Sequence, residues 1–192
     1  MGGAVMTKVL KKSVTFGLRD GALRIVVVAD THSRPHPKSA EIIAAERPDR
    51  ILHAGDIGEL KVLDELAKIA PTDAVRGNID ARDNDVPDIL TVDVCEGGES
   101  LLKILVLHIG VNGPRLRGDV VRLAQAEGAR VVVCGHSHVP FLGRDRDLTI
   151  FNPGSIGPRR FQLPIVFGVI DISRERVEMK HVDCESGQRW LP

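Results

Sequence analysis

Side chains that bind metal ions recur at the ends of short apolar runs in this sequence of 192 residues. The groupings are Asp30-Thr31-His32, Gly55-Asp56, Gly77-Asn78, His108 and Gly135-His136-Ser137-His138. Carboxylate oxygens, amide oxygens and imidazole nitrogens are ligands of divalent metal ions in proteins. A single histidine after a strand is usually an ordinary hydrogen-bonded residue. Five groupings in one chain instead predict a shared metal centre.

The apolar runs before these residues predict β-strands that are buried on both faces. They span residues 24–29, 51–53, 74–76, 101–107 and 130–134. In an open α/β sheet the carboxyl ends of the strands converge on one crevice, so residues far apart in the sequence can meet there. We therefore expect the five groupings to lie close together.

Two carboxylates, those of Asp30 and Asp56, would share this crevice. Burying two carboxylates together without a basic partner is unfavourable unless a cation or a proton compensates for their charge. Metal ions would supply that charge. Gly55, Gly77 and Gly135 each precede a proposed ligand, and glycine permits the sharp turns that aim such a side chain.

The rest of the sequence predicts one domain that is α/β in its first part and rich in strands in its last. Helical spacing of apolar residues occurs within 40–44, 60–67 and 116–124, and residues 89–94 are expected to form a hairpin with 101–107. Further strands are predicted at 139–143, 148–151, 163–171 and 176–182. Residues 1–23 lack a clear period and are expected to form an N-terminal extension before a domain at 24–192.

Composition excludes several classes of function. Lys plus Arg and Asp plus Glu number 26 each, so no net positive field attracts nucleic acid. Tyr is absent, which leaves few aromatic rings for stacking on bases. The longest apolar runs are far shorter than the ~20 residues that cross a bilayer. Cys95, Cys134 and Cys184 are too widely spaced for a zinc site and odd in number, which favours free thiols and a cytoplasmic location.

Together, the five groupings resemble the calcineurin-like metallophosphoesterase superfamily in order and spacing over about residues 24–182. The segment Asn152-Pro153-Gly154-Ser155 is similar to the small YfcE-like phosphodiesterase branch, whose fold is shared with the retromer sorting subunit. This resemblance implies a four-layer α/β/β/α sandwich with two mixed sheets. It also makes a homodimer the expected oligomeric state.

The resemblance implies two bound divalent metal ions. Asp30, His32, Asp56 and His138 would bind one ion, and Asp56, Asn78, His108 and His136 would bind the other. The mixed nitrogen and oxygen ligands favour Mn, with Fe, Ni, Co or Zn as alternatives. The implied reaction is attack of a metal-bridging hydroxide on a small phosphate ester, a phosphodiester or alternatively a phosphomonoester. The predicted catalytic residues are Asp56, Asn78 and His136.

Two positions depart from the family pattern. Many members have a proton-donating histidine where this chain has Ile79, and the YfcE-like branch usually has a second histidine where this chain has Gly110. Because isoleucine cannot donate a proton, we expect a preference for good leaving groups. The alternative is a catalytically weak, metal-binding scaffold for protein interactions.

Several other residues keep two interpretations each. Asp80 either supports a ligand or is a solvated turn residue, and His53 either orients a ligand or is a satisfied residue at a strand end. His36 either substitutes for the missing histidine or lies in a surface loop. Arg34, Arg82, Arg159 and Arg160 are either phosphate clamps or solvated loop residues.

Overall fold

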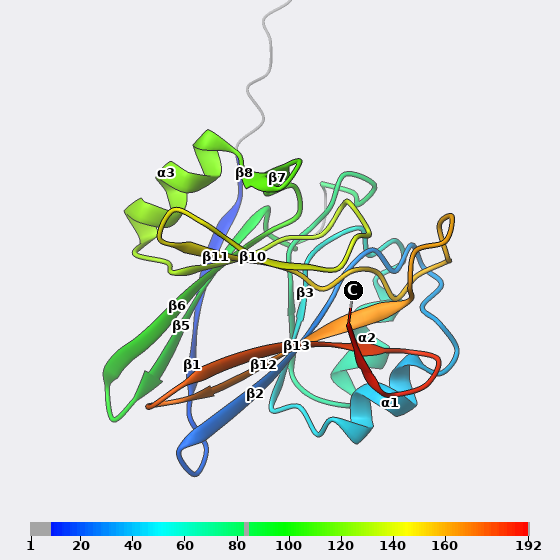
Figure 1. The fold of residues 1–192 in the computed structure, drawn as a ribbon, viewed down its shortest axis with the longest axis horizontal. Helices are drawn as coiled ribbons and strands as arrows, with labels where there is room; N and C mark the ends of the chain where they lie inside the picture. Colours follow the sequence, from blue (N-terminus) through cyan, green and yellow to red (C-terminus); the bar gives the residue numbers. More distant parts are fainter. Residues whose placement is uncertain (1–8, 83–84, 192) are drawn as a thin grey trace, which may run out of the picture.

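Two six-stranded mixed sheets form the centre of the protein in a computed structural model that describes residues 9–82 and 85–191 (Figure 1). Sheet A has the order β1 (Lys11–Gly17), β5 (Ile89–Glu96), β6 (Glu99–Leu107), β9 (Val131–Val133), β11 (Leu148–Asn152) and β10 (Phe141–Asp145). Sheet B has the order β14 (Arg189–Trp190), β13 (Val177–Asp183), β12 (Val166–Ser173), β2 (Ala22–Val28), β3 (Arg50–His53) and β4 (Thr72–Ala74). The strands β7 (Val111–Asn112) and β8 (Arg115–Leu116) pair with each other.

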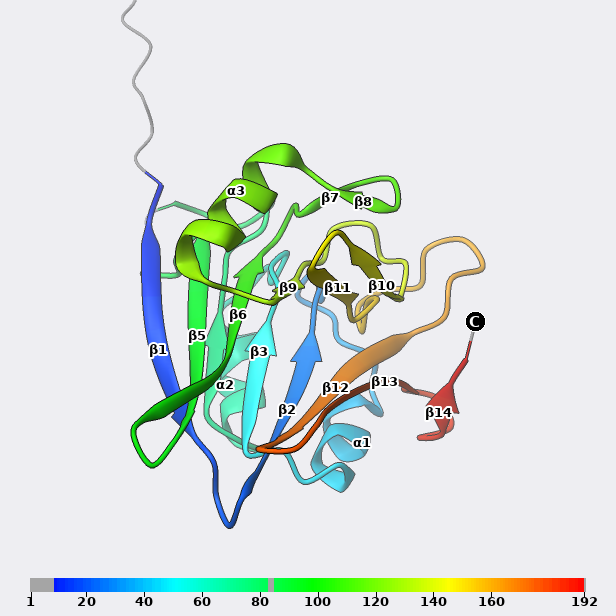
Figure 2. The same ribbon diagram turned by 60° about the vertical axis from the view of Figure 1, so that its left-hand side comes forward.

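Three apolar cores separate the elements into four layers. The strands of both sheets contribute alternate side chains to the core between the sheets, such as Ile25 and Val27 of β2 and Val131 and Val133 of β9. The opposite face of sheet B packs against α1 (Ser39–Ala45) and α2 (Lys61–Ala67). The opposite face of sheet A packs against α3 (Gly118–Glu127). The helices therefore lie on the two outer sides of the sheets, as Figures 1 and 2 show. The two mixed sheets are confirmed, and this arrangement is consistent with the expected α/β/β/α sandwich.

Parallel strands bring the predicted ligands to one end of this sandwich. β2, β3 and β4 are neighbouring parallel strands of sheet B, and β6 and β9 are neighbouring parallel strands of sheet A. The five predicted groupings follow these five strands at their carboxyl ends. The strand pairing thus explains why segments spread over more than a hundred residues reach the same place.

The N-terminal region differs from the sequence-based expectation. Residues 11–17, expected to belong to an extension, form β1, which pairs in parallel with β5 at the edge of sheet A. Phe16 of β1 is buried in the core between the sheets, whereas Lys11, Lys12 and Ser13 are exposed. An edge strand with one polar face and few apolar residues gives only a weak periodic signal. The sheet therefore extends beyond the predicted boundary at residue 23; residues 1–8 lie outside the described part.

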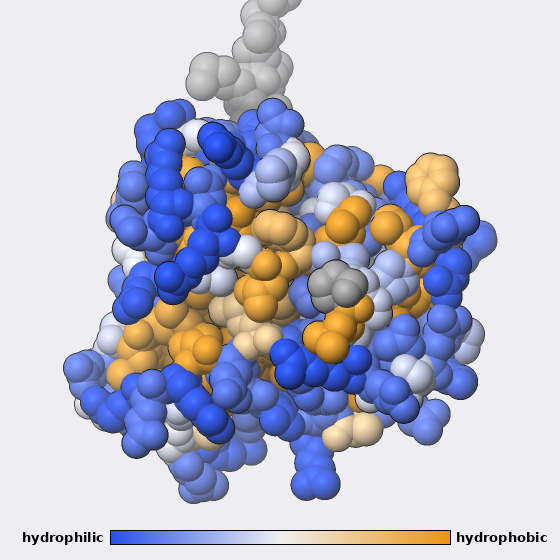
Figure 3. Space-filling view, viewed as in Figure 1, coloured by the Kyte–Doolittle hydropathy of each residue, from blue (hydrophilic) through white to orange (hydrophobic). Residues whose placement is uncertain are grey.

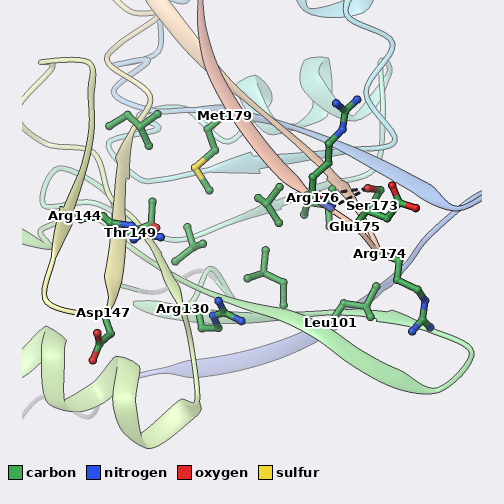
Figure 4. Close-up of a pocket in the computed structure, with 15 residues that line it drawn as sticks. Leu101, Arg130, Arg144, Asp147, Thr149, Ser173, Arg174, Glu175, Arg176 and Met179 are labelled. Atoms are coloured by element: carbon green, nitrogen blue, oxygen red, sulfur yellow. Dashed lines mark hydrogen bonds between the residues drawn. The ribbon is translucent and has the colours of Figure 1, made fainter.

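An opening lies between the two sheets at the end of the sandwich opposite the predicted ligands. It has a volume of about 490 Å³ and is bounded by β10, β11 and the start of β9 on one side and by the β12–β13 hairpin on the other (Figure 4). Apolar side chains reach the surface around it, including Leu142 and Val177. Figure 3 shows apolar side chains gathered near the middle of the face seen in Figure 1. Arginine and acidic side chains surround these residues.

None of the helices in the described ranges is long and apolar enough to cross a membrane. The thiols of Cys95, Cys134 and Cys184 are free. This agrees with the wide spacing of the cysteines in the sequence.

Candidate metal centre

The predicted ligands form two adjacent groups at the carboxyl ends of the strands. One group contains Asp30, His32 and His138, and the other contains Asp56, His108 and His136. Within each group, one potential ligand atom per residue lies within 4.8 Å of the others. Asn78 joins the second group, because its Oδ1 lies 3.1 Å from Nε2 of His108. All seven predicted ligands are thus brought together.

Asp56 lies between the two groups and faces both with its carboxylate. Its Oδ1 is 3.2 Å from Nε2 of His108, and its Oδ2 is 3.7 Å from Nε2 of His32. Burial alone would raise the pKa of Asp56, but the hydrogen bond and charge of His108 and the N–H of Ile79 together lower it to about 2. The carboxylate is therefore ionised at neutral pH and offers one oxygen to each group.

Asp30 and His138 have buried polar atoms whose chemistry fits a cation. Oδ1 of Asp30 and both ring nitrogens of His138 are buried and have no hydrogen-bond partner among the described residues. Burial raises the pKa of Asp30 to about 7, whereas burial and the nearby Arg160 lower the pKa of His138 to about 4. Buried polar atoms without partners are rare and costly. Oδ1 of Asp30 and Nε2 of His138 lie 3.4 Å apart, and a divalent ion held by these two residues would satisfy both atoms.

The orientation of His108 also suits a metal ligand. Its Nδ1 lies 2.8 Å from the carbonyl oxygen of Ala54 and donates to it, so Nε2 is the nitrogen that would bind an ion. Without an ion Nε2 donates to Oδ1 of Asp56; burial alone would lower the pKa of His108, but this hydrogen bond raises it. A backbone acceptor of this kind fixes the ring and the tautomer of metal-binding histidines. His108 is buried, whereas Asn78 and His136 are exposed at the same group. The centre is therefore closed on the protein side and open toward solvent.

The backbone is unusual at five of the seven ligand positions. Asp30, His32, Asp56, His136 and His138 have φ angles of 56°, 46°, 54°, 70° and 59°. This left-handed region is sparsely populated by residues other than glycine, and occupying it costs on the order of 1–3 kcal/mol per residue. Such strain is concentrated at functional sites, where the surrounding structure holds it.

The glycines that precede ligands serve mainly to allow close approach. A side chain at Gly77 would collide with the carboxylate of Asp56, and a Cβ at Gly135 would lie 2.9 Å from Oδ2 of Asp30. Only Gly55 among the three also has a left-handed φ, at 93°. The expected role in sharp turns therefore holds for Gly55, while Gly77 and Gly135 make room for the two carboxylates.

Asp80 holds two of the ligand loops together. It is buried, and its carboxylate accepts hydrogen bonds from the backbone N–H groups of Gly77 at 2.7 Å, Gly58 at 2.8 Å and Ile57 at 3.1 Å. These bonds join the loop that carries Asn78 to the loop that carries Asp56. Of the two interpretations of Asp80, the supporting role is the one that this geometry favours.

His53 occupies a buried position beneath the centre. Its Nδ1 accepts the N–H of Gly55 at 3.2 Å, and its Nε2 lies 3.0 Å from Oγ1 of Thr31, which donates to the carbonyl oxygen of Ile57 at 2.8 Å. Burial lowers the pKa of His53 to about 3, so the ring is neutral, as this chain of hydrogen bonds requires. His53 therefore supports the loops without joining either ligand group.

The segment Asn152-Pro153-Gly154-Ser155 supports the other side. Nδ2 of Asn152 donates to the carbonyl oxygen of Gly135 and to Oγ of Ser137, and Oγ of Ser155 donates to the carbonyl oxygen of Asp30. His181 in turn donates to the carbonyl oxygen of Asn152 at 2.7 Å. Asn152 and Ser155 were notable in the sequence only through the family resemblance, because buried hydrogen bonds to loops leave no periodic signal.

A basic pocket of about 430 Å³ borders the first ligand group. Arg34, Arg159 and Arg160 line it together with His32. Nη2 of Arg160 lies 3.1 Å from Nε2 of His32, while Arg159 pairs with Glu185 at 2.6 Å. Arg160 is therefore the arginine nearest the centre. Arg82 is exposed and lines neither this pocket nor the ligand groups, and His36 contributes to neither group.

The comparisons with known proteins agree with this geometry. The family model described as "Calcineurin-like phosphoesterase superfamily domain" matches residues 23–175. A protein of Methanocaldococcus jannaschii named "Probable metallophosphoesterase" is 33% identical over 149 residues, which are 73% of this chain and 72% of that protein.

Solved structures share the fold at lower identity. Vacuolar Protein Sorting 29 (Vps29) from Cryptosporidium parvum superposes with a TM-score of 0.72 at 16% identity, covering 88% of this chain and 95% of that one. YfcE, a phosphoesterase from E. coli, superposes with a TM-score of 0.60 at 17% identity, covering 88% and 97%.

Proposed function

Since the chain belongs to the calcineurin-like phosphoesterase superfamily, we propose that it is a dinuclear-metal-dependent phosphoesterase that hydrolyses phosphodiester bonds, with phosphomonoesters as a second substrate class. The observation that carries this proposal is the position of Asp56, whose two carboxylate oxygens face two separate ligand groups. Two metal ions that share one carboxylate are the arrangement used by two-metal hydrolases, with ~3.5–4 Å between the ions.

The ligands divide between the ions as the family pattern suggests. Asp30, His32, Asp56 and His138 would hold one ion, and Asp56, Asn78, His108 and His136 would hold the other. The mixture of imidazole and oxygen ligands suits Mn best, with Fe, Ni, Co and Zn as alternatives.

The residues of the chain account for binding and orientation of the substrate. Asn78 and His136 are exposed at the centre and can contact a phosphate that binds there. Arg160 adds a guanidinium beside His32, where it can pair with a phosphate oxygen. The position of the family's proton donor is taken by Ile79, which is 48% exposed and cannot protonate a leaving oxygen. We therefore expect esters of acidic alcohols, such as aryl phosphodiesters, to react fastest.

A second candidate function is a metal-binding interaction scaffold with weak activity. Two observations favour it, namely Ile79 at the donor position and the likeness in fold to Vps29. The intact set of seven ligands favours the enzyme, because a scaffold has no need for two ions that share Asp56. A homodimer and a cytoplasmic location also stay predictions.

The test is hydrolysis of bis-p-nitrophenyl phosphate by metal-stripped protein resupplied with Mn²⁺, together with the metal content per chain. We expect two ions per chain and activity that depends on Mn²⁺. Asp56→Asn removes the shared negative charge and should lower both metal content and activity. Asp93→Asn, which changes an aspartate of β5 that pairs with Lys103, is the matched control and should change neither.

Two results would contradict the proposal. Wild-type protein that binds two ions per chain and stays inactive on diesters and monoesters would favour the scaffold. Asp56→Asn protein with the metal content and activity of the wild type would show that Asp56 does not bridge two ions.

A further inference from the structure

A cavity of about 450 Å³ lies directly beside the metal centre, on a different side from the basic pocket. His136 belongs to the second ligand group and also lines this cavity. The walls come from the residues after β6, from the β7–β8 hairpin and from the segment between β9 and β10. A molecule whose phosphate binds at the centre could therefore extend into the cavity past His136.

The side chains that line the cavity are mainly apolar. They include Ile109, Val111, Val139, Phe141 and Ile150, and Pro114 completes the wall at the hairpin. Ile109 is 36% exposed and Val139 is 45% exposed, although both are branched aliphatic residues. Apolar side chains gathered in one exposed hollow mark a binding surface more often than a random feature of the surface.

Two of the polar side chains along the wall, Asn152 and Ser137, form hydrogen bonds within the protein. Asn152 bonds to Gly135, Ser137 and Gly154, and Oγ of Ser137 also accepts the N–H of Val139. Among the residues that the structure describes, the lining contains no Asp, Glu, Lys or Arg. A charged group placed in this cavity would lose its hydration without gaining an ionic partner, which is unfavourable.

The basic pocket on the other side of the centre has the opposite character. His32, Ser33, Arg34, Glu59, Pro158, Arg159 and Arg160 line it. The two spaces therefore sort the parts of a substrate by polarity, with anionic oxygens toward the arginines and an uncharged group toward Ile109 and Val139. His32 borders one space and His136 borders the other.

From this arrangement we propose that the cavity is a binding site for an uncharged aryl or bulky alkyl group of the substrate ester, with Val139 and Ile109 as specificity-determining residues. The proposal rests on the proposed phosphoesterase function, and it narrows the substrate class to phosphate esters of apolar alcohols. The volume accommodates such a group, because a cavity of ~150 Å³ suffices to hold benzene. Esters whose alcohol carries a charge are disfavoured here.

The test compares two phosphonates that share one anionic head, phenylphosphonate and methylphosphonate. Their dissociation constants are measured by calorimetry on Mn²⁺-loaded protein, and their inhibition constants against bis-p-nitrophenyl phosphate are measured separately. We expect the wild type to bind phenylphosphonate at least about tenfold more tightly, since apolar contacts of this size discriminate by roughly 10- to 200-fold. The ratio of the two dissociation constants in the wild type tests the inference without any variant.

Val139→Asp places a carboxylate in the cavity wall and should abolish most of the preference for the phenyl group. Leu142→Asp is the matched control, because Leu142 is similarly exposed, at 48%, and lines the opening between the sheets instead. It should leave the ratio unchanged. Because the two phosphonates carry the same charge, repulsion by the new carboxylate cancels in the ratio.

Equal binding of the two phosphonates by the wild type would overturn the inference, and so would a Val139→Asp variant that keeps the wild-type ratio. Either result in a protein that hydrolyses diesters leaves the proposed function intact. A protein without esterase activity that still prefers phenylphosphonate in calorimetry would retain the cavity as a binding site while the proposed function fails.

Discussion

Both ends of the sandwich carry charged and polar side chains, but the two ends place them in different surroundings. At the ligand end, Asp30 and His138 are buried and have polar atoms without partners in the described part of the chain. At the other end, the charged side chains around the opening between the sheets are exposed, and two of them form surface ion pairs. Arg174 pairs with Glu96 and Glu99, and Arg176 pairs with Glu178.

The size of an opening does not distinguish the two ends. The opening between the sheets has a volume of about 490 Å³ and the two spaces beside the metal centre have about 450 and 430 Å³. What differs is the free energy stored locally, because unpartnered buried groups and left-handed backbone are costly unless a ligand compensates for them. The comparison predicts that substitutions at the ligand end change function strongly and that those at the other end do not.

The largest effect is expected for Asp30→Asn. This substitution keeps the size of the side chain and removes the charge that a metal ion requires, so activity on bis-p-nitrophenyl phosphate should fall on the order of 10³-fold. Steady-state kinetics at saturating Mn²⁺ measures it. Activity within threefold of the wild type would remove Asp30 from the metal centre.

Asp30→Asn is also expected to stabilise the metal-stripped protein. This gain in stability is smaller than the loss of activity. The pKa of Asp30 is about 7 in the fold and near its ordinary 3.8 in the unfolded chain. Between these pH values the folded state retains a proton that the unfolded state has released, so the contribution of Asp30 to stability decreases as the pH rises and is lowest above 7. At pH 8 the free energy of unfolding of Asp30→Asn should therefore exceed that of the wild type by up to about 4 kcal/mol, since one pKa unit corresponds to about 1.36 kcal/mol, and denaturant titration measures it.

The same denaturation experiment at pH 4 is the control for this prediction. There the carboxyl of Asp30 is protonated in the fold, and the two proteins should differ little. An equal difference at both pH values would mean that the substitution acts through packing and not through the buried charge.

The smallest effect is expected for the arginines, and it compares the two ends directly. Arg160→Ala removes a guanidinium beside His32 and should raise KM about tenfold with a smaller change in kcat, since one charged hydrogen bond to phosphate is worth ~1.5–3 kcal/mol at most. Arg174→Ala, at the opposite end, should leave both constants unchanged, because exposed ion pairs contribute about 0–1 kcal/mol to stability alone. Equal effects of the two variants on KM would indicate that positive charge anywhere on the protein attracts the substrate, and not a contact of Arg160 at the centre.

The ligand set could be predicted from the sequence because each ligand follows an apolar run. Buried parallel strands have a strong local signal, and their carboxyl ends meet by topology alone, so Asp30, Asp56 and His108 are placed together without knowledge of any contact. The hairpin of β5 and β6 and the end of α3 at Gly128, whose φ is 71°, follow from equally local signals.

The remaining features depend on contacts that no local pattern encodes. The two-residue strands β7 and β8 are too short to show a period, and the role of Asp80 depends on three N–H groups from two loops. The left-handed conformation of Asp30 and His138 runs against the local preference of these residues, and only the assembled site explains it. Sequence patterns report what a segment favours by itself, so they fail where neighbours impose a different state.

The β7–β8 hairpin has a consequence for how the protein could change. Its two strands pair with each other, and its residues line one wall of the apolar cavity while contributing no ligand. Insertions or exchanges within 112–115 would leave the register of both large sheets intact, whereas Val111 and Leu116 pack against the core under α3. Relatives can therefore differ in this short loop, and so in the molecules that they bind, without a change in the metal ligands. The loop is also where redesign could alter the substrate that is bound.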